Sequence, residues 1–109
     1  MDWRDEPIGP DDRTIASSHG TLAEPASWLA LVRDELAQDG GYLTVSSGPP
    51  HLYAQAANLV GTLVLEYRDG GPDRHFQAAG VTFDQVAAAL SQWFDGGREF
   101  IADHEWTRI

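Results

Sequence analysis

The sequence predicts a single α+β domain, in which an antiparallel sheet of about four strands carries an N-terminal helix and a C-terminal helix packed on one face. Two segments with apolar residues at helical spacing enclose a stretch in which apolar and polar residues alternate. At 109 residues the chain has the length of one domain, and it contains no internal repeat. We expect residues 21–109 to form this domain and residues 1–20, which mix Asp, Pro and Gly without a period, to be an irregular acidic arm.

The first helix is expected within residues 24–41. Pro25 suits the first helical position, and Gly40 or Gly41 suits the residue that follows the last turn. Apolar residues at helical spacing would form one buried side of this helix. They are Trp28, Leu29, Val32 and Leu36.

The second helix is expected to begin after Thr82, whose hydroxyl can cap its first turn, and to end at the Asp-Gly-Gly of residues 95–97. Residues 98–109 would then close the chain either as a short helical turn or as a last extended segment. The apolar side of the second helix consists of Phe83, Val86, Leu90 and Phe94.

Strands are expected between the two helices. Residues 42–46 alternate in polarity before a turn at 46–50. Residues 51–61 combine Ala, which favours helix, with Leu52 and Tyr53 and flanking turn residues, and we expect a strand there. Residues 62–68 are rich in β-branched and aromatic residues, which predicts a central strand.

A hairpin is expected at residues 65–78, and its register can be predicted because directly opposite residues share one face of a sheet. Pairing Leu65 with Phe76 also sets Leu63 opposite Ala78, so that the apolar residues all face the core. A shift by one residue would mix the two faces.

The same register places polar residues together on the outer face of the hairpin. Glu66 would face His75 and Arg68 would face Asp73, joined by a four-residue loop at 69–72. Two cross-strand charge pairs explain this polar cluster without any catalytic role.

Composition limits the classes of partner. Seventeen acidic and seven basic residues give a formal net charge of -10, which repels nucleic acid and would attract a basic protein. The chain has no Cys, no leader-like N-terminus and no run of about 18 apolar residues, so we expect a cytoplasmic protein that does not bind membranes.

No motif for catalysis, phosphate binding or metal binding is present. The four His residues lack helical ligand spacing, and no Gly-x-Ser-x-Gly or phosphate-binding loop occurs. We therefore expect no enzyme, no metal and no cofactor. The side chains that could form an uncovered polar face for a partner are Tyr53, Gln55, Glu66, Arg68, Asp73 and His75.

Three stretches support a resemblance: the hairpin segment "LVLEYRDGGPDRHFQA", the helix end "QWFDG" and the closing "HEWTRI". Over about residues 51–109 the chain resembles small acidic actinobacterial proteins, mostly uncharacterised, some of which look like predicted immunity proteins of bacterial toxin systems. The resemblance implies a cytoplasmic binder that occludes a cognate toxin without catalysis, and it assigns no residue a role.

Three functions follow, in order of preference. The first is a non-enzymatic, acidic protein-binding module, either an immunity-type inhibitor or a chaperone-like adaptor. The second is a small-ligand-binding protein or minor enzyme that uses His75 with Glu66, because a carboxylate can orient an imidazole and raise its basicity. The third is a structural homo-oligomer, such as a homodimer, formed through a sheet edge or exposed aromatic residues.

Overall fold

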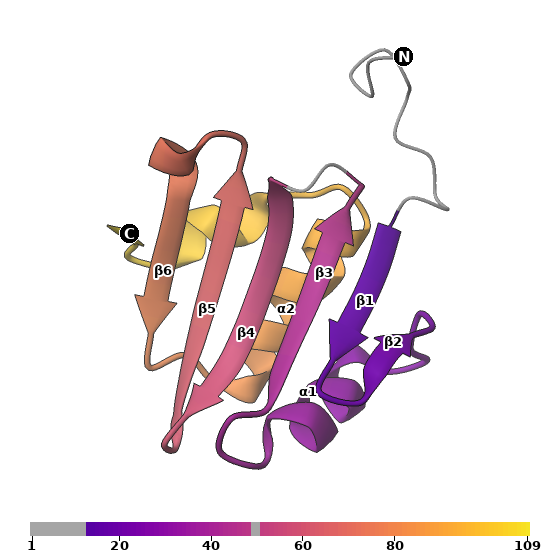
Figure 1. The fold of residues 1–109 in the computed structure, drawn as a ribbon. Helices are drawn as coiled ribbons and strands as arrows, with labels where there is room; N and C mark the ends of the chain where they lie inside the picture. Colours follow the sequence, from indigo (N-terminus) through magenta and orange to yellow (C-terminus); the bar gives the residue numbers. More distant parts are fainter. Residues whose placement is uncertain (1–12, 49–50) are drawn as a thin grey trace.

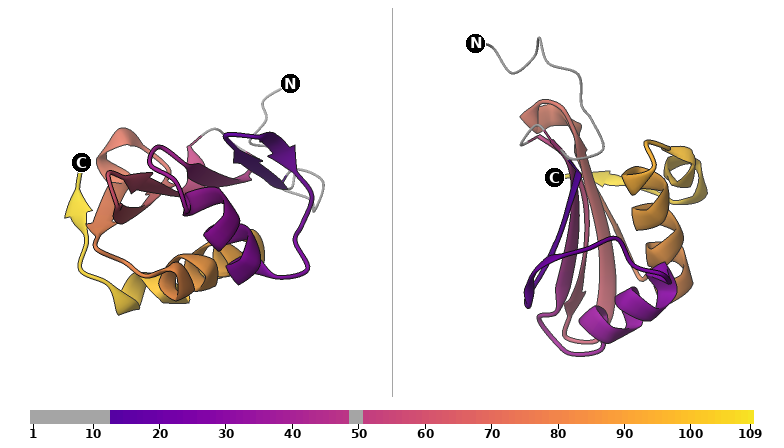
Figure 2. Two further views of the ribbon diagram at one scale, coloured as in Figure 1. Left: turned by 90° about the horizontal axis from the view of Figure 1, so that it is seen from below. Right: turned by 90° about the vertical axis from the view of Figure 1, so that its right-hand side faces the viewer.

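The computed structural model describes residues 13–48 and 51–109. In this part of the chain, seven strands form one antiparallel sheet in the spatial order β2-β1-β3-β4-β5-β6-β7. Both α-helices lie on the same face of the sheet (Figures 1 and 2). The elements are β1 (Arg13–Ser17), β2 (Gly20–Leu22), α1 (Trp28–Leu36), β3 (Tyr42–Ser47), β4 (Leu52–Leu59), β5 (Thr62–Asp69), the 3-10 turn η3 (Pro72–Arg74), β6 (His75–Ala79), α2 (Phe83–Phe94), the 3-10 turn η4 (Glu99–Asp103) and β7 (Thr107–Arg108).

The expectation of about four strands is wrong, because three additional strands complete the sheet. β1, β2 and β7 contain five, three and two residues. Alternation of polarity is recognisable only over about four to eight residues, so β2 and β7 are too short to produce it. Backbone hydrogen bonds position β2 beside β1 and β7 beside β6.

Part of the expected irregular arm is regular. β1 lies within residues 1–20 and pairs along its whole length with β3, and only Ile15 and Ser17 of its five residues are buried. A single large apolar residue in five gives no visible period, which is why this strand was not predicted. Residues 1–12 of the expected arm, and Pro49 and Pro50 of the expected turn at 46–50, lie outside the described residues.

The first helix is shorter than predicted at both ends. Ser27 is the N-cap and its hydroxyl accepts a hydrogen bond from the backbone N–H of Ala30, so Pro25 precedes the helix. The helix ends at Leu36, before the glycines at 40 and 41. Val32 and Leu36 are fully buried, and Trp28 and Leu29 pack against the core from its edge.

The second helix confirms its prediction. Thr82 and Gln85 form a capping box, in which each side chain accepts a hydrogen bond from the other residue's backbone N–H. Gly96, with a φ of 90°, follows the last turn. The helix buries Val86, Leu90 and neighbouring apolar residues against the sheet.

The alanines of β4 face the helix layer. Ala54 and Ala56 are fully buried on the core side, beneath α2. Small side chains let the helix approach the sheet closely here, which explains why a strand in the middle of the sheet carries residues of high helix propensity. The predicted strand is confirmed, and β5 beside it is an interior strand that buries Leu63, Leu65 and Tyr67.

An aromatic cluster closes the C-terminal side of the core. Tyr67 contacts Trp93, Phe100 and Trp106, with ring centroids 6.2, 5.9 and 4.8 Å away. Trp106 donates a hydrogen bond of 2.8 Å from its indole nitrogen to the carbonyl of Ile101. Residues 98–109 thus form a helical turn followed by a short strand, so both alternatives expected for this segment occur in succession.

Candidate functional site

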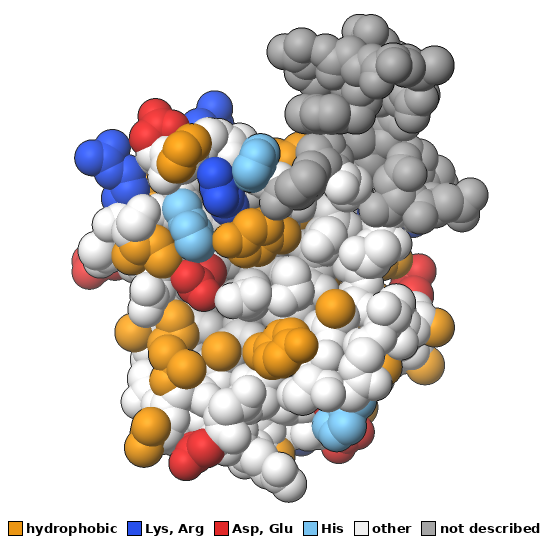
Figure 3. All heavy atoms as spheres, in the orientation of Figure 1, with side chains coloured by type: hydrophobic (Ala, Val, Ile, Leu, Met, Phe, Trp, Pro, Cys, Tyr) orange, Lys and Arg blue, Asp and Glu red, His pale blue; other side chains and the backbone are white. Residues whose placement is uncertain are grey.

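Among the described residues, no element covers the face of the sheet opposite the helices (Figure 2). We call this surface the outer face. The viewer of Figure 3 looks onto it: charged and histidine side chains gather toward its upper end, over β5 and β6, and uncharged side chains occupy most of the rest. Strand register brings to this face the residues Thr44, Ser46, Tyr53, Gln55, Glu66, Arg68, His75 and Gln77.

A hydrogen-bonded ladder crosses three strands of the outer face. Thr44, Gln55 and Glu66 lie directly opposite one another on β3, β4 and β5. The Thr44 hydroxyl donates to the Gln55 side-chain carbonyl at 2.8 Å, and the Gln55 amide donates to the Glu66 carboxylate at 3.2 Å. These side chains are half-buried, and the ladder fixes their orientation without a ligand.

A second row holds Tyr53, Arg68 and His75 beside the ladder. Arg68 lies opposite Tyr53 on one side and His75 on the other. The Tyr53 and His75 rings meet edge to face at 5.9 Å between centroids, and the Arg68 Nε donates to the carbonyl of Gly70 at 3.3 Å. Five of the six predicted partner-binding residues therefore lie together.

Asp73 does not join this group. The predicted register was wrong by two residues: Phe76 pairs with Tyr67, and Arg68 pairs with His75 in place of Asp73. The assignment of residues to faces survives, because a shift of two preserves the alternation of side chains. The predicted four-residue loop is longer, since η3 occupies residues 72–74 and holds Asp73 exposed in the turn.

Glu66 and His75 are diagonal neighbours on the outer face, although they were predicted to be directly opposite. The distance from Glu66 Oε1 to His75 Nε2 is 3.3 Å, and both side chains are about four-fifths buried. Within the described part of the chain, His75 Nε2 has no hydrogen-bond partner. The pair becomes an ion pair when His75 is protonated.

Negative charge is concentrated away from the outer face. Most carboxylates of the described residues lie on the helices or on the segments that connect them to the sheet. The strand and hairpin carboxylates, Glu66, Asp69 and Asp73, have Arg68 and Arg74 beside them. The outer face is nearly neutral, and the acidic surface is the helix layer with its Glu24, Asp34, Asp39, Asp84, Asp95, Glu99, Asp103 and Glu105.

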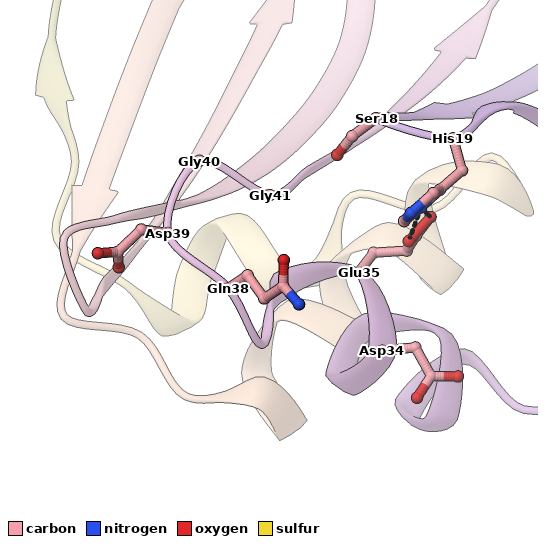
Figure 4. A pocket seen from close by; sticks show the side chains of 8 residues that line it. All are labelled: Ser18, His19, Asp34, Glu35, Gln38, Asp39, Gly40 and Gly41. Carbon is pink, nitrogen blue, oxygen red and sulfur yellow. Dashed lines mark hydrogen bonds and ion pairs between the residues drawn. The ribbon is translucent and has the colours of Figure 1, made fainter.

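A second polar cluster, which no sequence pattern indicated, is formed by Ser17, His19 and Glu35. Figure 4 shows the contact between His19 and Glu35. The Nδ1 of His19 lies 2.9 and 2.7 Å from the two carboxylate oxygens of Glu35. Glu35 is 7% exposed in its side chain and His19 is 73% exposed, so a buried carboxylate is paired with a surface imidazole. The residues come from β1, the β1–β2 turn and α1, and only the fold brings them together.

The Glu35 carboxylate is held in its charged form. A hydrogen bond from the Ser17 hydroxyl, together with the hydrogen bond and charge of His19, lowers the pKa of Glu35 below its ordinary value, although burial acts in the opposite direction. The adjoining pocket of about 250 Å³ is also lined by Gln38 and Gly40, while Asp34 points away from the pair. This cluster ties the β1–β2 turn to α1.

Residues 13–48 and 51–109 contain no group of three or more His, Asp or Glu side chains placed to hold a metal ion. In the same part of the chain, every helix is too short or too polar to cross a membrane.

The turn between β4 and β5 has an unusual residue. Val60 and Gly61 connect the strands with φ angles of 53° and 87°, a combination typical of the two-residue type I′ hairpin turn. Asn, Asp or Gly normally occupies the first position, since a β-branched residue there costs about 1–2 kcal/mol. Val60 is nevertheless present and 87% exposed, next to Leu59 at 53%. In the sequence, this hairpin turn is indicated only by the pair Val60-Gly61 between two segments of alternating polarity.

Comparison with known protein families, curated proteins and solved structures finds no match for this chain.

Proposed function

We propose that the protein is a non-enzymatic protein-binding module that contacts its partner through the outer face. The observation that carries this proposal is a half-buried, ordered set of polar and aromatic side chains on a sheet face that no described element covers. Tyr and Arg are enriched in the centres of protein interfaces, and the outer face offers Tyr53 and Arg68 side by side.

The order of the outer face favours binding. Association normally costs free energy because side chains lose rotamer freedom when the partner docks. The Thr44–Gln55–Glu66 ladder and the ring contact of Tyr53 with His75 already restrict these side chains in the free protein. A partner would then bind with less loss of entropy than on a face of mobile side chains.

The acidic helix layer would attract a basic partner. A net charge of -10 produces a field that accelerates the encounter with a positively charged protein, and this effect weakens as salt is added. An immunity-type inhibitor or a chaperone-like adaptor in the cytoplasm would have this character.

Affinity capture tests the proposal. The tagged chain is incubated with lysate of the native cell and washed at low and at high salt, beside a Tyr53→Ser/Arg68→Ser variant and an Asp34→Asn/Asp103→Asn variant. We expect a basic protein that the wild type and the helix-layer variant retain at low salt and that the outer-face variant loses. Equal recovery by the outer-face variant, or recovery of the bait alone, would contradict the proposal.

A second candidate function rests on the Glu66–His75 pair. The 3.3 Å approach and the unpartnered His75 Nε2 would suit a small-ligand site or a minor enzyme that uses the imidazole as a base. An NMR titration of the His75 ring, with Glu66→Gln as the comparison, tests it. Identical titration in both proteins and no response to a small-molecule library would count against it.

A further inference from the structure

The end of the molecule at the β4–β5 turn carries an apolar groove. Three segments line it: the end of α1, the β4–β5 turn and the connection from β6 to α2. The groove has a volume of about 460 Å³. Its apolar wall includes Leu36, Leu63, Val81 and Phe83. Val60, which directly precedes the lining residue Gly61 in the turn, is an exposed apolar residue beside this groove.

Val60 lowers the stability of the folded chain at this turn. Its left-handed backbone is unfavourable for a β-branched residue, and its 87% exposure shows that little packing within the chain offsets the strain. An Asn at this position would relieve the strain and remove the exposed apolar side chain. The chain therefore presents a valine where local stability favours a polar residue, next to a groove of matching polarity.

Charge around the groove indicates what would fill it. None of the described lining residues is Lys or Arg. Two exposed carboxylates are neighbours in the chain of the segments that line the groove. Asp84 follows Phe83 at the start of α2, and Asp39, which also borders the pocket beside His19 and Glu35, precedes Gly40, whose N–H bonds to the carbonyl of Asn58. A second copy of this chain, with its own net charge of -10, would be repelled from this end.

We propose that this groove binds a polypeptide segment that places an apolar side chain between basic ones. The apolar side chain enters the groove against Leu63 and Val81 and contacts Val60 at the rim, while its basic neighbours face Asp39 and Asp84. This site lies at the opposite end of the strands from Tyr53, Arg68 and His75, so it does not depend on the outer face. It would give a basic partner a second, separate attachment point.

NMR titration of the ¹⁵N-labelled protein with defined peptides tests this site. The probe is a blocked pentapeptide with a central Leu between two Ser residues and Arg at both ends, and a second probe carries Phe at the centre. Two matched peptides replace Arg by Glu, or the central residue by Ser. We expect amide shifts confined to residues 36–41, 58–63 and 80–84 with the basic apolar probes, and affinities about ten-fold weaker or more with either matched peptide.

The Val60→Asn variant separates binding from folding. Because Asn favours this turn, the variant should unfold at a higher temperature than wild type and yet bind the basic apolar peptides about ten-fold more weakly. Ile109→Asn, a change at an exposed apolar residue of the C-terminus, should leave binding unchanged. Absence of shifts at residues 58–63 and 80–84, or equal binding of the acidic peptide or by Val60→Asn, would overturn the proposal.

Self-association is the remaining outcome to distinguish. A dimer in solution that Val60→Asn abolishes would assign the groove to a second copy and contradict a basic occupant. The Tyr53→Ser/Arg68→Ser variant should bind these peptides as wild type does. A negative result for peptide binding in the groove can therefore be distinguished from a negative result for partner binding through the outer face.

Discussion

The imidazole of His19 reaches the buried carboxylate of Glu35 at 2.7 Å and joins the β1–β2 turn to α1. A negative charge two residues from the C-terminal cap of a helix is unfavourable to the helix dipole, so this carboxylate requires compensation from outside the helix. Ser17 and His19 supply it. The cluster therefore couples the edge of the sheet to the helix layer.

The pH dependence of stability should report this cluster. Since the pKa of Glu35 is lowered from 4.5 in the folded chain, its contribution is present above pH 4.5 and is lost as the pH falls through the folded-state pKa. We expect Glu35→Gln to cost about 1–3 kcal/mol at pH 5.5 and much less at pH 3, by urea unfolding. Asp34→Asn, at the exposed neighbouring carboxylate, is the control. An equal loss at both pH values would contradict this role of Glu35.

Gly41 should not tolerate a side chain. A Cβ on Gly41 would overlap the backbone carbonyl oxygen of Glu35. This carbonyl belongs to α1, so it cannot move aside without disturbing the end of the helix. We expect Gly41→Ala to lower the free energy of unfolding by about 3 kcal/mol. Gly80→Ala, where φ is +73° and the space around the new methyl is open, should cost only about 1 kcal/mol. Equal losses in the two variants would show that the close approach at Gly41 is unimportant.

Asn58 should stabilise the β4–β5 end through two hydrogen bonds. Its side-chain amide donates to the Leu36 carbonyl at 2.8 Å, and its side-chain oxygen accepts from the Gly61 N–H at 2.8 Å. Asn58→Ala leaves both groups without these partners, and we expect a loss of about 1–3 kcal/mol in chemical unfolding. Gln38→Ala, an exposed change near the same end of α1, should be nearly neutral. A similarly small effect of Asn58→Ala would contradict a stabilising role for these two hydrogen bonds.

Secondary structure was predictable where a segment was long enough to show its period. The stripe of α2 and its Thr82 cap lie within one continuous segment, as does the alternation of β5. β7 gives no such signal, because its two residues are fixed by pairing with β6. The hairpin register was wrong because the apolar pattern has a period of two and fits Leu65 or Tyr67 opposite Phe76 equally well. The 3-10 turn at residues 72–74 decides between them.

The candidate sites divide in the same way. Tyr53, Gln55, Glu66, Arg68 and His75 could be assigned to one face from alternation alone, whatever the register. The Ser17–His19–Glu35 cluster could not, since the pairing of β1 with β3 and the packing of α1 bring it together from separate elements. Such a contact depends on tertiary structure and leaves no local pattern in the sequence.

Hydroxyl-radical footprinting of the chain, free and bound to its captured partner, tests the outer face most directly. Tyr53 is partly exposed on this face, and Trp28 is partly exposed on the helix layer, so the two aromatic side chains report on opposite sides of the molecule. We predict that oxidation of Tyr53 falls at least about five-fold in the complex while that of Trp28 is unchanged. Unchanged oxidation of Tyr53 in a saturated complex would contradict binding through the outer face.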